Sequence, residues 1–390
     1  MRSIYLDYAA TTPVRKEVLS EMVLYMDKEF GNPSSFHSPG KKARDSIEIA
    51  REKIAKILNS RISEIIFTNG GTESDNLAIL GVARANKDKG KHIITSKIEH
   101  PAVLRACEQL AREGYEITYL PVDKSGTVKL DALKKELRMD TVLVSIMYAN
   151  NEIGTIEPIK KIAKIIRDNT DKKKNGWPYF HTDACQVAGV LEMDILKLGV
   201  DLLTFNGSKI YGPKGIGVLF SKKGIKLEPL MYGGGQEYGL RSGTENVPAI
   251  IGLAKALELG QIEKEKENRR LTKLRDFLIN AVLKNISGAI LNGDPINRLP
   301  NNANISIPRV EGEAMVLYLD SKGIYCATGS ACSSNSLKPS HVLLAIGRSH
   351  ELAHDSLRFT LGKSTTKTDI DYVIKTLPEI VKKLSEISSL

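Results

Sequence analysis

Residues 206–215, NGSKIYGPKG, place two lysines in a turn-rich stretch directly after the apolar run LLTF. Glycines and a proline surround these lysines, although a surface lysine needs no such setting. A lysine amine becomes a nucleophile toward carbonyl groups when burial or nearby cations lower its pKa. The stretch therefore suggests that one of the two amines is held for chemistry.

Four further loops that follow predicted strands carry polar side chains of complementary types. They have the sequences NGGTESDN, KIEHP, ANNE and DACQ, and they supply Thr72, His100, Asn151, Asp183 and Gln186. In an open parallel sheet, ligands bind beyond the C-terminal ends of the strands. We therefore expect these side chains to meet the lysine in one site.

Pyridoxal 5'-phosphate is a natural partner for such a lysine, because its aldehyde reacts with amines. The GGTES sequence, with Thr72, precedes a predicted helix whose first backbone N–H groups suit a phosphate. Asp183 is placed to keep the pyridine nitrogen protonated, and His100 could lie over the ring. Asn151 and Gln186 could donate to its phenolic oxygen. Each residue alone fits a helix cap, a turn former or an ordinary loop, but together they favour this cofactor.

Alternating helix and strand patterns from residue 41 to residue 220 predict an α/β unit with a mainly parallel sheet. A long amphipathic pattern follows near residues 250–282, and the shorter elements beyond it predict a smaller α+β domain. We expect a large domain of residues 14–257, and a small domain of residues 1–13 and 258–390. Thr368 is predicted to cap the last helix.

Composition excludes several classes of protein. No stretch is long and apolar enough to span a bilayer, and no apolar segment follows the N-terminus, so we expect a cytoplasmic protein. The four cysteines lack metal-finger spacing and indicate a reducing compartment. The formal charge of +10 is spread along helix faces between acidic residues, so we expect no nucleic-acid surface.

An ordered series of motifs runs across nearly the whole chain: YLDYAATTP, GNPSSFH, FTNGGTESDNLAI, KIEHPAV, NNEIGTI, GSKIYGPKGIG, RSGTENVPAI, LNGD and ATGSACSS. This series resembles that of the pyridoxal-phosphate cysteine desulfurases of the NifS/IscS type, in the class V aminotransferase family. The resemblance implies the aminotransferase-like fold (fold type I) and a homodimer with active sites at the interface. It also implies conversion of L-cysteine to L-alanine. The sulfur would pass as a persulfide to an acceptor, such as an iron–sulfur scaffold protein or a tRNA-thiolation enzyme.

The resemblance also implies residue roles. Lys209 matches the lysine that bonds to the cofactor, and Cys332 matches the nucleophile that takes the sulfur. Thr244 matches a residue that reaches the phosphate from the partner subunit. Arg358 matches the arginine that clamps the substrate carboxylate, a task suited to a bidentate donor, and Asn32 is placed with the substrate. The implied catalytic residues are Cys332, Lys209 and His100, and the implied cofactor-binding residues are Gly71, Thr72, His100, Asn151, Asp183, Gln186, Asn206, Ser208, Lys209 and Thr244.

The surroundings of two cysteines and the residues before Lys209 allow three further expectations. Cys332 stands among small residues that cannot bury it, so we expect an exposed thiol, whereas Cys107 fits the apolar face of its helix. The family usually has Ser/Thr-x-His before the lysine, where this chain has Asn206, Gly207 and Ser208. A histidine that could add charge to the phosphate site is therefore absent.

Two alternatives remain. HELAH, residues 350–354, satisfies the H-E-x-x-H pattern of zinc hydrolases. The segment leaves barely one helical turn before the next strand and has no evident third ligand, so we expect no metal site. A selenocysteine lyase, or another class V aminotransferase-like enzyme, keeps the fold and changes the substrate.

Overall fold

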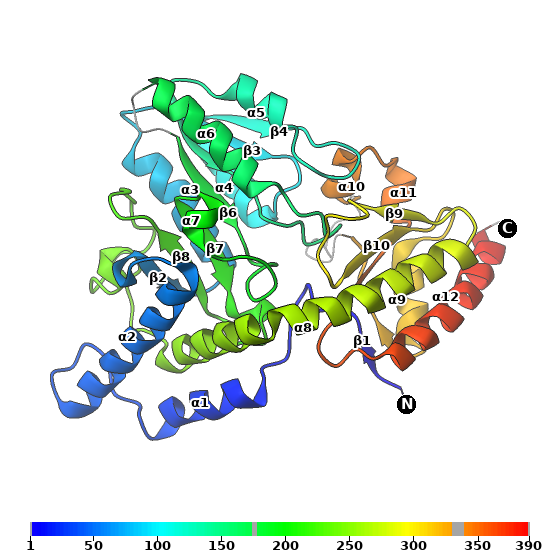
Figure 1. Cartoon of the computed structure of the whole chain (residues 1–390), viewed down its shortest axis with the longest axis horizontal. Helices are drawn as coiled ribbons and strands as arrows, with labels where there is room; N and C mark the ends of the chain where they lie inside the picture. The colour runs from blue at the N-terminus through cyan, green and yellow to red at the C-terminus, as the bar shows by residue number, and fades with distance from the viewer. Residues whose placement is uncertain (1, 174–177, 330–338, 389–390) are drawn as a thin grey trace.

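A computed structural model describes residues 2–173, 178–329 and 339–388 of the 390-residue chain. The chain forms a large α/β part and a smaller part, and one long helix, α8 (Val247–Asn285), runs along both (Figure 1). The first half of α8 packs into the core of the large part, up to Leu257, and its second half packs into the smaller core from Leu271 onward. The helix therefore joins the two parts mechanically.

A seven-stranded sheet forms the centre of the large part, in the order β2-β8-β7-β6-β5-β3-β4. Only β8 runs antiparallel to its neighbours, which confirms the predicted, mainly parallel sheet. Most strand residues are buried, as expected for strands covered on both faces. The strands are β2 (Ile65–Thr68), β3 (His92–Ser96), β4 (Glu116–Leu120), β5 (Thr141–Ser145), β6 (Tyr179–Asp183), β7 (Leu202–Asn206) and β8 (Gly217–Ser221).

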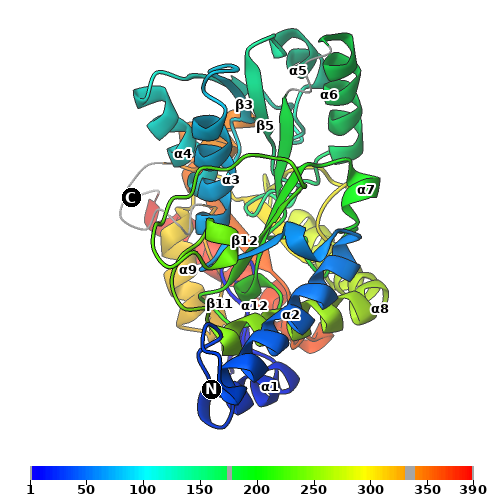
Figure 2. The ribbon, with the colours of Figure 1, turned by 90° about the vertical axis from the view of Figure 1, so that its left-hand side faces the viewer.

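Helices cover both faces of this sheet, as Figure 2 shows. One face packs against α3 (Gly71–Ala85) and α4 (Pro101–Arg112). The opposite face packs against α8 and against α2 (Ser38–Leu58), α5 (Leu130–Glu136), α6 (Ile159–Lys173) and α7 (Ile195–Leu198). A further helix, α1 (Lys16–Asp27), lies on α8. This layering leaves the C-terminal ends of the parallel strands free to form a site.

The smaller part is built on a three-stranded antiparallel sheet, β12-β10-β9, covered by α8, α9 and α12. The N-terminal strand β1 joins this part because it pairs in parallel with β11, with Ile4 opposite Ile324. This part packs around a hydrophobic cluster of its own. The division into residues 14–257 and residues 1–13 with 258–390 stays a proposal. The elements are β1 (Ile4–Tyr5), β9 (Ile290–Asn292), β10 (Asn302–Ser306), α9 (Gly312–Asp320), β11 (Ile324–Tyr325), α10 (His341–Ala345), α11 (His350–His354), β12 (Ser356–Thr360) and α12 (Lys367–Ser388).

The predicted cap of the last helix is wrong by two residues. Helix α12 begins at Lys367, so Thr368 lies inside its first turn. Thr366 and Asp369 bond reciprocally instead: the Asp369 N–H donates to Thr366 Oγ1 at 3.2 Å, and the Thr366 N–H donates to Asp369 Oδ2 at 2.9 Å. This arrangement satisfies two free N–H groups of the first turn, whereas a cap at Thr368 would leave them unpaired.

None of the helices in the described ranges is long and apolar enough to cross a membrane.

Candidate active site

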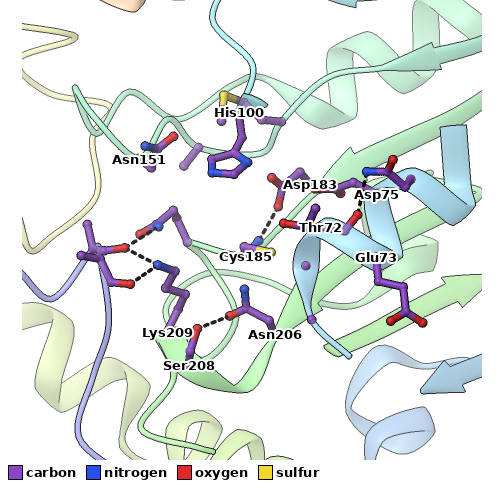
Figure 3. A pocket seen from close by; sticks show the side chains of 18 of the residues that line it. Thr72, Glu73, Asp75, His100, Asn151, Asp183, Cys185, Asn206, Ser208 and Lys209 are labelled. Atoms are coloured by element: carbon purple, nitrogen blue, oxygen red, sulfur yellow. Dashed lines mark hydrogen bonds between the residues drawn. The ribbon is translucent and has the colours of Figure 1, made fainter. Parts of the chain in front are cut away.

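A cavity of about 600 Å³ opens where the C-terminal ends of the central strands face the smaller part. It lies at the position that the strand-end argument predicts for a ligand. Figure 3 shows side chains from separate strand-end loops pointing into it. The structure brings together in its wall Gly71, Thr72, His100, Asn151, Asp183, Gln186, Asn206, Ser208, Lys209 and Arg358.

A tight turn after β7 presents Lys209. Gly207, Ser208 and Lys209 form a single 3₁₀ turn, and a Cβ atom at Gly207 would lie 2.4 Å from the carbonyl oxygen of Pro213. Glycine is therefore required where the loop folds back on itself. Lys209 Nζ donates to the carbonyl oxygens of Ala9, at 2.7 Å, and Ala10. Lys214 is exposed. The glycines and the proline of this stretch thus serve to aim one amine into the cavity.

The start of α3 offers a seat for an anion. Helix α3 begins at Gly71, and Gly70 before it provides no side-chain cap, so the first N–H groups of the helix are free of such a partner. A Cβ atom at Gly71 would lie 2.7 Å from Cys185 Sγ and 3.0 Å from Asn206 Nδ2, so glycine lets these side chains pack against the helix end. Ser208 Oγ donates to Asn206 Oδ1 at 3.3 Å. Neither Asn206 nor Ser208 brings a positive charge to this seat.

Asp183 is the last residue of β6 and lies on the floor of the cavity (Figure 3). Its side chain is buried, and Oδ1 accepts the Cys185 N–H at 2.8 Å. The thiol of Cys185 lies in the same wall, and burial raises its pKa well above the usual range, with Asp183 acting in the same direction. The floor therefore presents a carboxylate, and the thiol beside it stays protonated.

His100 caps helix α4 with its side chain. Nδ1 accepts the Ala102 N–H at 3.1 Å, so the neutral ring carries its hydrogen on Nε2. Burial lowers the pKa of His100; Lys209 and His341 act in the same direction, and Asp183 opposes them. The imidazole therefore enters the cavity neutral, as a hydrogen donor.

Arg358 reaches the cavity from β12, in the smaller part. Its Nη2 donates to Asp7 Oδ1 at 2.8 Å and its Nη1 donates to the carbonyl oxygen of Asn151 at 3.2 Å. Nε is buried and has no hydrogen-bond partner among the residues that the structure describes. A carboxylate placed beside this guanidinium would meet a free donor.

Two predicted residues lie outside the wall of this cavity, and a third is not among the described residues. Thr244 lines a separate cavity of about 240 Å³, together with Asn69 and Arg241. Asn32 lies in the connection between α1 and α2 and lines neither cavity. Cys332 falls in residues 330–338, outside the described residues.

Sequence reasoning missed part of the cavity wall. Asp75 lies in it beside Asp183, and Ala9 and Ala10 lie in it near Lys209. The Ala9 and Ala10 carbonyls are backbone groups and carry no side-chain signal. Asp75 is in the TESDN motif, but its role depends on which face of α3 meets the sheet.

The H-E-x-x-H segment forms α11, a helix of five residues in which both His350 and His354 are exposed. Within residues 2–173, 178–329 and 339–388, no group of three histidine, cysteine or acidic side chains is arranged to hold a metal ion. The two histidines do not form part of a recognisable zinc site in this region.

The residues present fit pyridoxal phosphate in three respects. An amine lies in the cavity at Lys209, a helix start without a side-chain cap suits the phosphate, and the buried Asp183 carboxyl suits a protonated ring nitrogen. His100 donates hydrogen from the wall, next to the same floor. The residues present therefore suit the aldehyde, the phosphate and the ring nitrogen of the cofactor.

Comparisons with known proteins show the family of the chain. Residues 4–373 match the aminotransferase class-V family. Cysteine desulfurase IscS of Dictyoglomus turgidum is 56% identical over 387 residues, which cover 99% of this chain and 96% of that protein. Cysteine desulfurase IscS of Methanosarcina thermophila is 53% identical over 389 residues, which cover 100% of this chain and 94% of that protein.

Solved structures show the same relationship. A NifS-like protein superposes with a TM-score of 0.91 at 39% identity, covering 98% of this chain and 100% of the other. A NifS-like protein from Rickettsia africae superposes with a TM-score of 0.86 at 33% identity, covering 98% of this chain and 100% of the other. The chain belongs to the aminotransferase class-V family, among relatives that carry the names IscS and NifS-like.

Proposed function

We propose that the protein is a cysteine desulfurase that converts L-cysteine to L-alanine. The substrate's carbon–sulfur bond breaks and a sulfur–sulfur bond forms, so that L-cysteine and the Cys332 thiol give L-alanine and a persulfide on Cys332. The reaction needs no added oxidant, because the atoms and electrons of the two sides balance. The observation that carries the proposal is full-length similarity to IscS proteins together with one cavity that gathers Lys209, Asp183 and Arg358.

We propose pyridoxal phosphate as the cofactor, held by the side chains that line the cavity. Lys209 would hold it covalently, the start of α3 with Thr72, Asn206 and Ser208 would bind its phosphate, and Asp183 would pair with its ring nitrogen. When bound, this cofactor supplies an electron sink that stabilises negative charge on the substrate. Every other function of the site falls to the chain itself.

Side chains of the cavity bind the substrate carboxylate, remove the α-proton and donate hydrogen. Arg358 binds the substrate carboxylate, for which its buried Nε is a free donor within the described part of the chain. Lys209 is the base that removes the α-proton, because His100 Nδ1 is occupied by the Ala102 N–H and leaves only the hydrogen of Nε2 toward the cavity. His100 therefore donates hydrogen rather than accepting it.

Cys332 takes the sulfur and passes it to an acceptor, for which we propose an iron–sulfur scaffold protein or a tRNA-thiolation enzyme. The free thiols of Cys107 and Cys326 are buried, and burial raises the pKa of both. Neither is suited to attack sulfur, because the thiolate is the nucleophile. We also place the reaction in the cytoplasm, whose reducing conditions keep such thiols free; recovery of the protein in another cell fraction would contradict this.

We propose that two copies of the chain complete two sites. Phe30 and Phe36 lie between α1 and α2, in the part that projects at the lower left of Figure 1, with exposed fractions of 77% and 99%. Tyr232 is 75% exposed. Exposed aromatic side chains of this size are typical of a covered interface. Thr244 and Asn32, which line no part of their own chain's main cavity, are the residues we expect to serve the partner.

A homodimer would have a mass of twice 42.9 kDa in solution. Light scattering coupled to gel filtration measures this mass directly. Replacing both Phe30 and Phe36 by serine should shift the equilibrium to the monomer and lower activity, while Phe277→Ser, a change at a 40% exposed phenylalanine on α8, serves as the matched control. A wild-type protein that runs as a monomer at assay concentration would contradict the proposal.

The function itself is tested on purified protein supplied with pyridoxal phosphate and L-cysteine. We expect a visible absorption band that cysteine perturbs, and equal amounts of alanine and released sulfide in the presence of a thiol reductant. Selenocysteine as a competing substrate tests the alternative lyase activity: a preference for it over cysteine of about tenfold or more in kcat/KM would favour that alternative. Alanine formation without sulfur release would indicate another class V activity.

A further inference from the structure

A second buried carboxyl lies in the floor of the cavity beside Asp183. Asp75, on α3, has a side chain that is 2% exposed and lines the same cavity (Figure 3). The hydroxyl of Thr204, on β7, hydrogen-bonds to its carboxyl group. The Oδ1 atom of Asp75 is buried and has no hydrogen-bond partner within the described ranges. An ionised carboxylate in this position would leave one oxygen without the donors that a buried charge requires.

The basic side chain that forms a close contact with Asp75 is His181. The Nε2 atom of His181 lies 3.7 Å from Asp75 Oδ1. Its ring is fully buried, with Nδ1 bonded to Ser145 Oγ at 2.8 Å and Nε2 bonded to Thr204 Oγ1 at 3.1 Å. Burial lowers the pKa of His181 to about 3. The imidazole is therefore neutral and gives Asp75 no positive partner.

The other titratable groups whose charges act on Asp75 are acids, while Lys209 and His100 line the same cavity. Asp183 on β6, Glu99 after β3 and the Cys185 thiol all interact with it, and each would carry a negative charge if ionised. Burial raises the pKa of Asp75 well above the usual range; the Asp183 carboxylate and Glu99 act in the same direction, and the Thr204 hydrogen bond opposes them. When two carboxyl groups share a site, the ionised form of one raises the pKa of the other.

We propose that Asp75 is the protonated, neutral member of a carboxyl pair with Asp183, so that the pair carries one negative charge and presents it on Asp183. Asp75 is then a positioning residue for the cofactor's ring nitrogen: it fixes where the charge of the floor lies and touches neither substrate nor cofactor. The assignment of that ligand rests on the proposed function. The protonation state of Asp75 concerns the protein alone and is measurable without cofactor.

The carboxyl pair makes the stability of the folded protein fall as the pH rises. An unfolded aspartate has a pKa of about 3.9. Above that pH, Asp75 is ionised in the unfolded chain but still protonated in the folded chain. The free energy of unfolding therefore falls as the pH rises, until Asp75 also ionises in the folded chain. In this window each pH unit changes the unfolding constant by up to about tenfold. Asp75→Asn is neutral at every pH and lacks this effect.

The test compares apoproteins of the wild type, Asp75→Asn and Asp201→Asn by denaturant unfolding between about pH 5.5 and about pH 8. The unfolding constant of the wild type, relative to that of Asp75→Asn, should rise with pH by up to about tenfold per unit. Asp201 is the matched control, because it is equally buried but accepts from Arg167 and from the Phe180 N–H. Its replacement should lower stability at neutral pH. If the unfolding constant of the wild type divided by that of Asp75→Asn did not change with pH, the proposal would be overturned.

Cofactor affinity gives a second readout. Pyridoxal phosphate should bind Asp75→Asn within about twofold of the wild type at neutral pH, because a neutral group replaces a neutral group, whereas Asp183→Asn should bind at least about tenfold more weakly. Equal weakening in both variants would mean that Asp75 carries the charge, and would overturn the proposal. A wild type that binds no cofactor would refute the proposed function, and the unfolding data would still decide the state of Asp75.

If Asp75→Asn does not fold, the wild-type apoprotein labelled with ¹³C at its aspartate carboxyl carbons answers the question by NMR. The Asp75 signal is assigned from the resonance missing in Asp75→Glu. A titration midpoint well above the ordinary aspartate value supports the pair, and a midpoint at or below that value overturns it.

Discussion

Lys209→Ala is expected to lower alanine formation from L-cysteine by more than about 10³-fold, because one change removes both the covalent anchor of the cofactor and the proposed base. The amine lies in the cavity on the carbonyls of Ala9 and Ala10, with Asp183 in the same floor. Alanine offers neither a nucleophile nor a proton acceptor. Alanine production per enzyme, measured at saturating cysteine, gives the loss directly.

Lys214→Ala is the matched control for this variant. Lys214 belongs to the same turn-rich stretch but is exposed, so its removal should leave the rate within about twofold of the wild type. The far-ultraviolet circular dichroism of both variants should equal that of the wild type. If Lys214→Ala lost activity and Lys209→Ala kept it, the assignment of the reactive lysine would be reversed.

Cys332→Ser is expected to abolish persulfide formation and sulfide release, to below about one thousandth of the wild-type rate, while the visible band of the bound cofactor stays. A serine hydroxyl is a far weaker nucleophile toward sulfur than a thiolate, and cannot hold the transferred sulfur as a persulfide. The measurement is the mass of the protein after a single turnover with cysteine, since wild type should gain one sulfur atom.

Cys326→Ala provides the comparison within the same segment of the chain. The Cys326 thiol is buried, and burial is the main reason that its pKa lies far above the usual range for a cysteine. We therefore expect this variant to gain sulfur on Cys332 as the wild type does. Sulfur gained by Cys332→Ser would mean that another thiol is the acceptor.

Much of the cavity could be predicted because topology fixes where strand-end loops meet. The C-terminal ends of parallel strands lie at one edge of a sheet, so His100, Asp183 and Lys209 converge although they are far apart in the chain. Helix α4 can also be predicted from the sequence, because Pro101 marks its start and apolar residues follow at helical spacing.

Other features depend on packing that a sequence pattern does not contain. Asp75 looks like an ordinary polar residue near a helix start, and only the rotation of α3 against the sheet buries it beside Asp183. Residue type alone favours Thr368 as the cap. Thr366 is the cap instead, because it forms two reciprocal hydrogen bonds with Asp369, three residues later. Thr244 and Asn32 lie away from their own chain's main cavity, and the proposed second copy is what would place them at a site.

The pairing of β1 with β11 has a consequence for the order in which the molecule is made. Strand β1, which begins at Ile4, cannot pair with β11 until Ile324 has left the ribosome. The segment after β1 carries the carbonyl groups of Ala9 and Ala10, which accept hydrogen bonds from Lys209. Contacts between such distant residues form late, because a long loop has to close first. The N-terminus is therefore expected to stay protease-sensitive on nascent chains until synthesis is nearly complete, and binding of the proposed cofactor is expected to follow synthesis.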